Sequence, residues 1–152
     1  MSARHVRYFA LIYGIVFLLV GIAGFVPGLV TPPQAGPDPT VATGFGRLFD
    51  LFPVNVLHNL VHLAFGVWGL AAYRTFSAAR LYAQGVAVIY AILTVMGLIP
   101  LLNTTFGLIP LYGHDVWLHA VLAIVAAYFG WATVRAEAAP VGTTPTTGRV
   151  DR

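Results

Sequence analysis

The segment VNVLHNLVHLAFGVWGLAAY, residues 54–73, decides the fold class of this chain. It contains no Asp, Glu, Lys or Arg, and its length matches the about 20 residues that an α-helix needs to cross roughly 30 Å of hydrocarbon. Apolar residues would cover most faces of such a helix, whereas a membrane-spanning strand would alternate apolar and polar side chains. The segment therefore predicts a membrane-spanning helix.

Three further windows without Asp, Glu, Lys or Arg cover residues 8–26, 81–102 and 116–134. The chain has 152 residues, of which 59% are hydrophobic and 9% charged, and no soluble domain of this size buries so much apolar surface. The first window is too long for a signal peptide and lacks a small-x-small cleavage site. We therefore expect an all-α, integral membrane four-helix bundle.

The bundle is expected to occupy residues 1–135. The tail, residues 136–152, is dominated by Ala, Pro, Thr and Gly, a composition that predicts disorder. Residues 28–53 form a long loop rich in Pro and Gly, and its stretch 45–52 is predicted to be amphipathic and to lie at the membrane interface.

The basic residues indicate the orientation of the helices. The chain has no lysine, and the arginines gather before the first window, between the second and third, and after the fourth, whereas the first connection holds one and the third none. The positive-inside rule then places both termini in the cytoplasm and the loop 28–53 outside. A nucleic-acid partner is not expected, because the sequence lacks the clustered basic face that binding nucleic acid would require. The arginines are Arg4, Arg7, Arg47, Arg74, Arg80, Arg135, Arg149 and Arg152.

Two pairs of polar residues interrupt the apolar windows at helical spacing. His58 and His62 are four residues apart, and so are Asp115 and His119, so each pair lies on one face of its helix. Both helices start at the outer surface, which places the pairs at matching depth. Ionisable groups at membrane depth usually face the bundle interior and have a partner. We therefore expect the four side chains to converge in the outer half of the bundle.

The same segments share a spacing that favours a duplicated helical hairpin. His62 lies nine residues after Pro53, and His119 lies nine residues after Pro110. In this register His58 corresponds to Asp115. The predicted site does not depend on the duplication.

Four interpretations of the polar cluster remain open. His58, His62, Asp115 and His119 would supply three imidazoles and a carboxylate, a set that suits Zn, Fe or Cu. Alternatively, His62 and His119 would be the axial ligands of haem b. A His/Asp relay would suit a proton or small-solute translocator. Finally, the cluster would only fix helix register in an accessory subunit, through hydrogen bonds between helices.

Absent residues exclude several enzyme classes. Without cysteine there is no disulfide, no iron–sulfur cluster and no c-type haem. The two serines, Ser2 and Ser77, lie far from the histidines in the sequence and on the cytoplasmic side, so serine-nucleophile chemistry is not expected. No phosphate-binding loop with a lysine exists. We assign no catalytic residue, and His114, at the predicted water boundary, is expected to be exposed.

The run N-x-x-H-N-x-x-H from Asn55 to His62, followed later by Asp115, Leu118 and His119, resembles the bacterial domain-of-unknown-function 4383 family, with a likeness over residues 6–135. The resemblance implies a small four-helix membrane protein of a bacterial cytoplasmic membrane, without a known activity. Expected partners are the lipid bilayer and either a second copy of the chain or another membrane protein. The motif positions that the resemblance implies are Asn55, His58, Asn59, His62, Asp115 and His119, with Asn55 and Asn59 forming a structural polar network.

Overall fold

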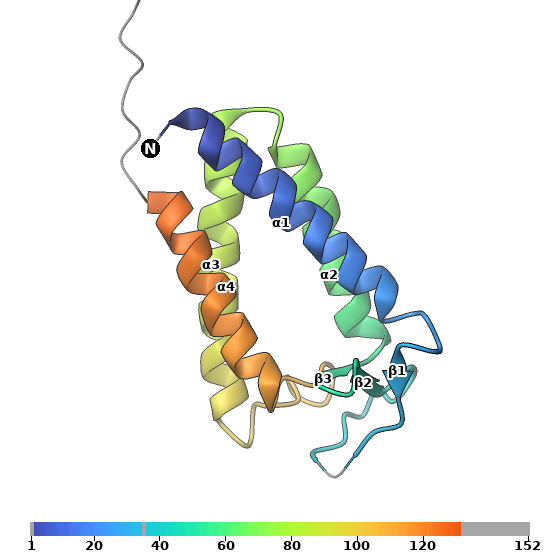
Figure 1. The fold of residues 1–152 in the computed structure, drawn as a ribbon. Coiled ribbons are helices and arrows are strands. Elements are labelled where there is room, and N and C mark those ends of the chain that lie inside the picture. The colour runs from blue at the N-terminus through green and yellow to red at the C-terminus, as the bar shows by residue number, and fades with distance from the viewer. Residues whose placement is uncertain (1, 35, 132–152) are drawn as a thin grey trace, which may run out of the picture.

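The computed structural model of the chain describes residues 2–34 and 36–131 (Figure 1). The described residues are mostly helical and contain no closed sheet, as expected of an all-α protein. The predicted tail, residues 136–152, and the end of the fourth window lie outside the described residues. The helices are α1, Ala3–Ala23; α2, Val56–Ala72; α3, Phe76–Leu98; and α4, His114–Trp131.

The helix ends follow local capping signals, not the limits of the charge-free windows. The side chain of Asn55 accepts a hydrogen bond from the backbone N of His58 at 2.9 Å and so caps the start of α2. Thr75 caps α3 in the same way. Helix α3 ends at Leu98 because Ile99 precedes Pro100 and takes an extended conformation. Helix α3 therefore begins and ends earlier in the sequence than the charge-free window 81–102.

The outer loop contains a small sheet that the sequence did not predict. Its strands are β1, Val30–Thr31; β2, Gly46–Leu48; and β3, Phe52–Val54, all antiparallel in the order β1-β2-β3. Phe49 and Asp50 take left-handed backbone conformations, with φ of 54° and 60°, in the turn between β2 and β3. The stretch 45–52, predicted as an amphipathic segment, thus forms most of a β-hairpin. Strands of two or three residues are too short to show a period in the sequence.

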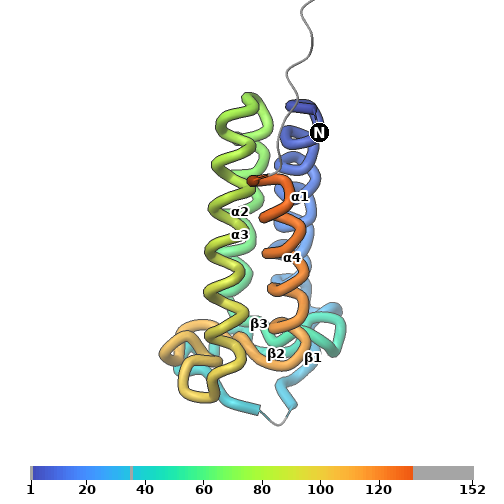
Figure 2. The backbone as a smooth tube through the Cα atoms, turned by 90° about the vertical axis from the view of Figure 1, so that its left-hand side faces the viewer, coloured from blue at the N-terminus to red at the C-terminus, as the bar shows by residue number. Residues whose placement is uncertain are grey.

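The helices form two hairpins, in which α1 packs against α2 and α3 against α4. Figures 1 and 2 show the N-terminus and the α2–α3 link at one end of the bundle, and the sheet and the α3–α4 connection at the other. Glycines allow the close contact within each hairpin: a Cβ on Gly69 would lie 2.7 Å from the Cα of Gly14, and one on Gly130 would lie 2.9 Å from the Cγ of Gln84.

Large apolar side chains cover the outer surface of all four helices. A soluble monomer rarely exposes apolar area on this scale. Among the described residues, α1 and α3 are long and apolar enough to cross a membrane. The exposed apolar residues include Ile12 and Leu19 on α1, Leu60 and Val67 on α2, Leu81 and Ile92 on α3, and Val121 and Ile124 on α4.

Candidate functional site

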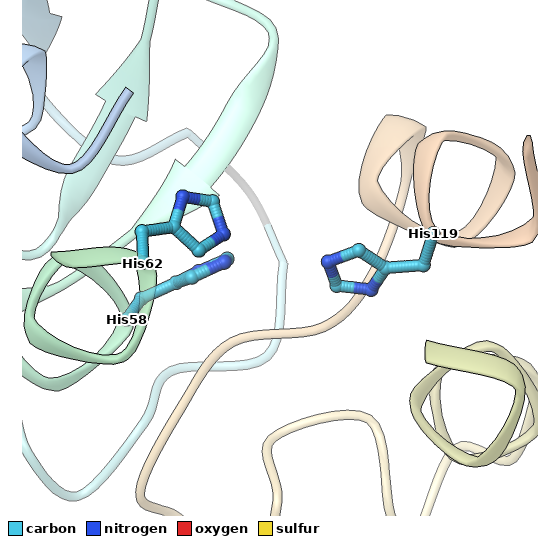
Figure 3. A group of neighbouring side chains, drawn as sticks. All are labelled: His58, His62 and His119. Carbon is cyan, nitrogen blue, oxygen red and sulfur yellow. The ribbon is translucent and has the colours of Figure 1, made fainter. Parts of the chain in front are cut away.

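Three histidines from two helices point toward one another in the bundle interior (Figure 3). Helix α2 supplies His58 and His62, and α4 supplies His119. Each ring offers one nitrogen, and the three nitrogens all lie within 4.8 Å of one another. The exposed fractions are 3%, 7% and 2%, respectively. The structure therefore brings together three of the four side chains that we expected to converge.

The hydrogen bond of His58 indicates which of its nitrogens is available to a ligand. Its Nδ1 lies 3.1 Å from the backbone oxygen of Pro53, in strand β3, which precedes α2. A carbonyl oxygen only accepts hydrogen bonds, so Nδ1 carries the proton and donates. In the neutral ring, Nε2 then keeps its lone pair. Metal-binding histidines are commonly oriented by such a bond from the other nitrogen.

Asp115 lies beside the three histidines but outside the group of three nitrogens. Its carboxyl group is buried, and Oδ2 lies 3.8 Å from Nδ1 of His58, which is too far for a hydrogen bond. Among the described residues, Oδ2 has no hydrogen-bond partner. Asp115 thus faces the nitrogen of His58 that Pro53 already holds. The geometry gives three imidazoles with a carboxylate behind one of them.

The other two histidines each have a buried nitrogen without a hydrogen-bond partner in the described part of the chain. These atoms are Nε2 of His62 and Nδ1 of His119. A buried polar atom left unpaired costs about 1–3 kcal/mol, so it usually has a partner or a function. No hydrogen bond joins these two side chains to each other within residues 2–34 and 36–131. A cluster that only fixes helix register would be expected to show such bonds.

Asn55 and Asn59 fix the position of α2. Besides capping the helix, Asn55 donates to the backbone oxygens of Val41, at 2.9 Å, and Leu108, at 2.7 Å. It therefore ties α2 to the outer loop and to the α3–α4 connection. Asn59 donates to the backbone oxygen of Gly24 at 2.8 Å, just after α1. Both asparagines thus form hydrogen bonds that hold the framework around the histidines.

A cavity of about 180 Å³ adjoins the histidines. Tyr90 of α3 lies against His119, with ring centroids 4.9 Å apart. The α3–α4 connection contributes Thr105, Ile109 and Leu111 to the cavity wall. The sequence analysis missed these residues, because nothing in the pattern shows that the connection folds back over the site. His114 is exposed at the start of α4, as we expected.

Comparisons with known proteins identify a family for this chain. A family model described as Domain of unknown function (DUF4383) matches residues 7–132. No curated protein and no solved structure matches the chain. The matched range contains both asparagines, all three clustered histidines and Asp115.

Proposed function

Because the chain belongs to the family Domain of unknown function (DUF4383), we propose its function from the site alone: it is an integral membrane protein that binds one transition-metal ion through His58, His62 and His119. One observation carries the proposal, namely three buried imidazole nitrogens within 4.8 Å of one another. Two nitrogens bound to one tetrahedral zinc ion at 2.0–2.1 Å would lie about 3.4 Å apart. Small side-chain rotations would close the difference.

The donor set and the cavity favour a metal ion over haem b. Imidazole ligands suit Zn, Cu and Fe. Haem would require His62 and His119 to lie on opposite sides of a large planar ring, whereas His58 lies close to both. The cavity of about 180 Å³ is also below the roughly 300–1,000 Å³ of typical sites for drug-sized ligands. It suits an ion with one or two small ligands.

The surroundings fit a metal site with an open position. Three protein ligands and a fourth, exchangeable one characterise zinc sites that keep a water molecule. Here the cavity beside the histidines would hold that fourth ligand. The Pro53 carbonyl and the Asp115 carboxylate, both near Nδ1 of His58, would fix and polarise this ring, as second partners of metal-binding histidines do.

The apolar exterior supports a membrane protein with four spans. Helices α1 and α3 have the required length, and α2, with 17 residues, and α4, with 18, reach the lower limit of about 17 residues for a span. In the described structure, Arg4, Arg7, Arg74 and Arg80 lie at the end with the N-terminus, which this orientation places in the cytoplasm. The histidines then lie in the outer half, close to the sheet.

The two hairpins support a duplication of one helical pair. Each consists of two consecutive helices that pack against each other, α1 with α2 and α3 with α4. His62 and His119 occupy corresponding places nine residues after Pro53 and Pro110. A duplication would explain why the histidines meet across the bundle interior.

A second function, proton transfer, is favoured by a single observation. The Asp115 carboxylate lies 3.8 Å from Nδ1 of His58, close enough for a proton to pass after a small movement. This function requires no metal. Metal content therefore separates it from the function that we propose first.

Titration with Co²⁺ tests the proposed site by spectroscopy. Four-coordinate Co²⁺ absorbs visible light much more strongly than hydrated Co²⁺, so the purified protein should develop intense bands that saturate at one equivalent. His119→Ala should abolish these bands. His114→Ala, which removes an exposed histidine on the same helix, should retain them. If the wild-type protein gave only the weak bands of hydrated Co²⁺, the proposal would be wrong.

A further inference from the structure

The cytoplasmic end of the bundle contains a polar cavity that is separate from the histidines. It has a volume of about 110 Å³ and is lined by Arg4, Arg7 and Tyr8 of α1 and by Tyr73, at the end of α2. Two guanidinium groups and two phenol rings from different helices therefore surround one small space. Such a lining is suited to a compact anion.

Contacts within the protein hold part of this cavity in place. Nε of Arg7 donates to the backbone oxygen of Tyr73 at 2.9 Å, and the guanidinium carbon lies 5.1 Å from the centre of the Tyr73 ring. The rings of Tyr8 and Tyr73 lie with centroids 6.2 Å apart. Arg7 is thus oriented before any ligand binds. Arg4 is exposed, one helical turn earlier on the same face.

The described structure has no acidic residue at this end to balance the arginines. Its acidic residues are Asp38 and Asp50 in the outer loop and Asp115 in the first turn of α4, all near the opposite end. The first turn of α1 has none. Within residues 2–34 and 36–131, no acidic side chain therefore neutralises Arg4 or Arg7.

An apolar groove continues from the polar cavity. Tyr8 lines both, and the groove runs between α1 and α4 past Phe9, Ile12 and Val125, with a volume of about 280 Å³. A ligand that filled both spaces would have an anionic head and an apolar chain. A phospholipid has this combination, whereas free phosphate has only the head.

We propose that Arg4, Arg7, Tyr8 and Tyr73 bind the phosphate of an anionic phospholipid, whose acyl chain lies in the groove between α1 and α4. Basic pockets on the cytoplasmic side of membrane proteins bind such headgroups, and arginine forms paired hydrogen bonds with phosphate oxygens. The inference rests on the proposed membrane orientation and not on the metal site.

Thermal unfolding in a neutral detergent tests the site. Phosphatidylglycerol should raise the melting temperature of the wild-type protein, because a ligand that binds the folded state stabilises it. Phosphatidylcholine with the same acyl chains should have a much smaller effect. Arg4→Gln should weaken the apparent affinity for phosphatidylglycerol about tenfold, since it removes one charge-assisted contact. Arg74→Gln is the matched control, because Arg74 is exposed at the same end but does not line the cavity.

The alternative outcomes are distinct. An equal loss in Arg4→Gln and Arg74→Gln would show that diffuse positive charge attracts the lipid, and an equal shift with inorganic phosphate would show a simple anion site. Either result would overturn the proposal, as would no shift with phosphatidylglycerol. Arg4 and Arg74 are both exposed, so neither substitution should disturb the fold, and circular dichroism of both variants should match the wild type. Metal binding by Arg4→Gln should also be unchanged, which separates failure here from failure of the metal site.

Discussion

The imidazole rings of His58 and His119 lie with their centroids 6.2 Å apart, one on α2 and the other on α4. These helices belong to different hairpins, and each packs mainly against its own partner helix. The histidines therefore meet where the two hairpins face each other. A ligand bound between them would also join the two halves of the bundle.

Replacing Asp115 tests whether its carboxylate supports His58 or binds the metal itself. Asp115→Asn keeps the side-chain volume and replaces the carboxyl group with an amide. Since Oδ2 lies 3.8 Å from Nδ1 of His58, we expect zinc affinity to fall about 10- to 100-fold with one ion still bound per chain. Isothermal titration calorimetry measures both quantities. Asp50→Asn, in the exposed turn of the sheet, should change neither. A complete loss of binding would make Asp115 a ligand.

Asn55 should matter both for stability and for the site. Asn55→Ala removes the cap of α2 and leaves the backbone oxygens of Val41 and Leu108 without their donor. We expect a loss of at least about 2 kcal/mol in the free energy of unfolding, together with weaker metal binding. Thr75→Ala removes only the cap of α3 and should cost about 1 kcal/mol with unchanged metal binding. Equal effects of the two variants on metal affinity would contradict this account.

A pair of glycines tests the contact between α1 and α2. A Cβ added at Gly24 would overlap the side-chain amide of Asn59, whereas a Cβ at Gly28 would meet nothing within 4 Å. We expect Gly24→Ala to destabilise the protein by about 1–3 kcal/mol and Gly28→Ala to have little effect. Denaturation in a mixed detergent series compares the two variants with the wild type. If Gly24→Ala were as stable as Gly28→Ala, the packing of Asn59 against Gly24 would be wrong.

Single cysteines test the orientation in the membrane, because the natural chain has none. Ser77 is exposed in the first turn of α3, and Asp38 is exposed in the outer loop. In intact cells, a membrane-impermeant thiol reagent should label Asp38→Cys but not Ser77→Cys. Both should be labelled after the membrane is opened. The reverse pattern would place the histidines in the cytoplasmic half.

The helices and the histidine cluster could be predicted because they depend on local spacing. An apolar window predicts a span, and a separation of four residues places His58 and His62 on one face. The position of Asp115 could not be predicted to the same detail. Its spacing from His119 places both side chains on one face of α4, but it does not show how far each side chain reaches between the hairpins. Asp115 lies one helical turn before His119 on α4, and its carboxyl group faces Nδ1 of His58 and not the group of three nitrogens.

The parts that the sequence did not predict depend on loops. Thr105 and Ile109 line the cavity because the α3–α4 connection folds back over the site, held by the bond from Asn55 to Leu108. This contact joins residues far apart in the chain, and no periodic pattern encodes it. The sheet was missed for a similar reason: its short strands are defined by their pairing within the outer loop, which no periodic pattern shows.

The central claim is that His58, His62 and His119 together bind one metal ion, and equilibrium zinc stoichiometry tests it most directly. The purified protein would be dialysed against buffered zinc, and bound metal would be measured by mass spectrometry of the digested sample. We predict one zinc ion per wild-type chain and per His114→Ala chain, and none in the variant that combines His62→Ala with His119→Ala. Equal zinc content in the wild type and the double variant, or none in any of them, would contradict the claim.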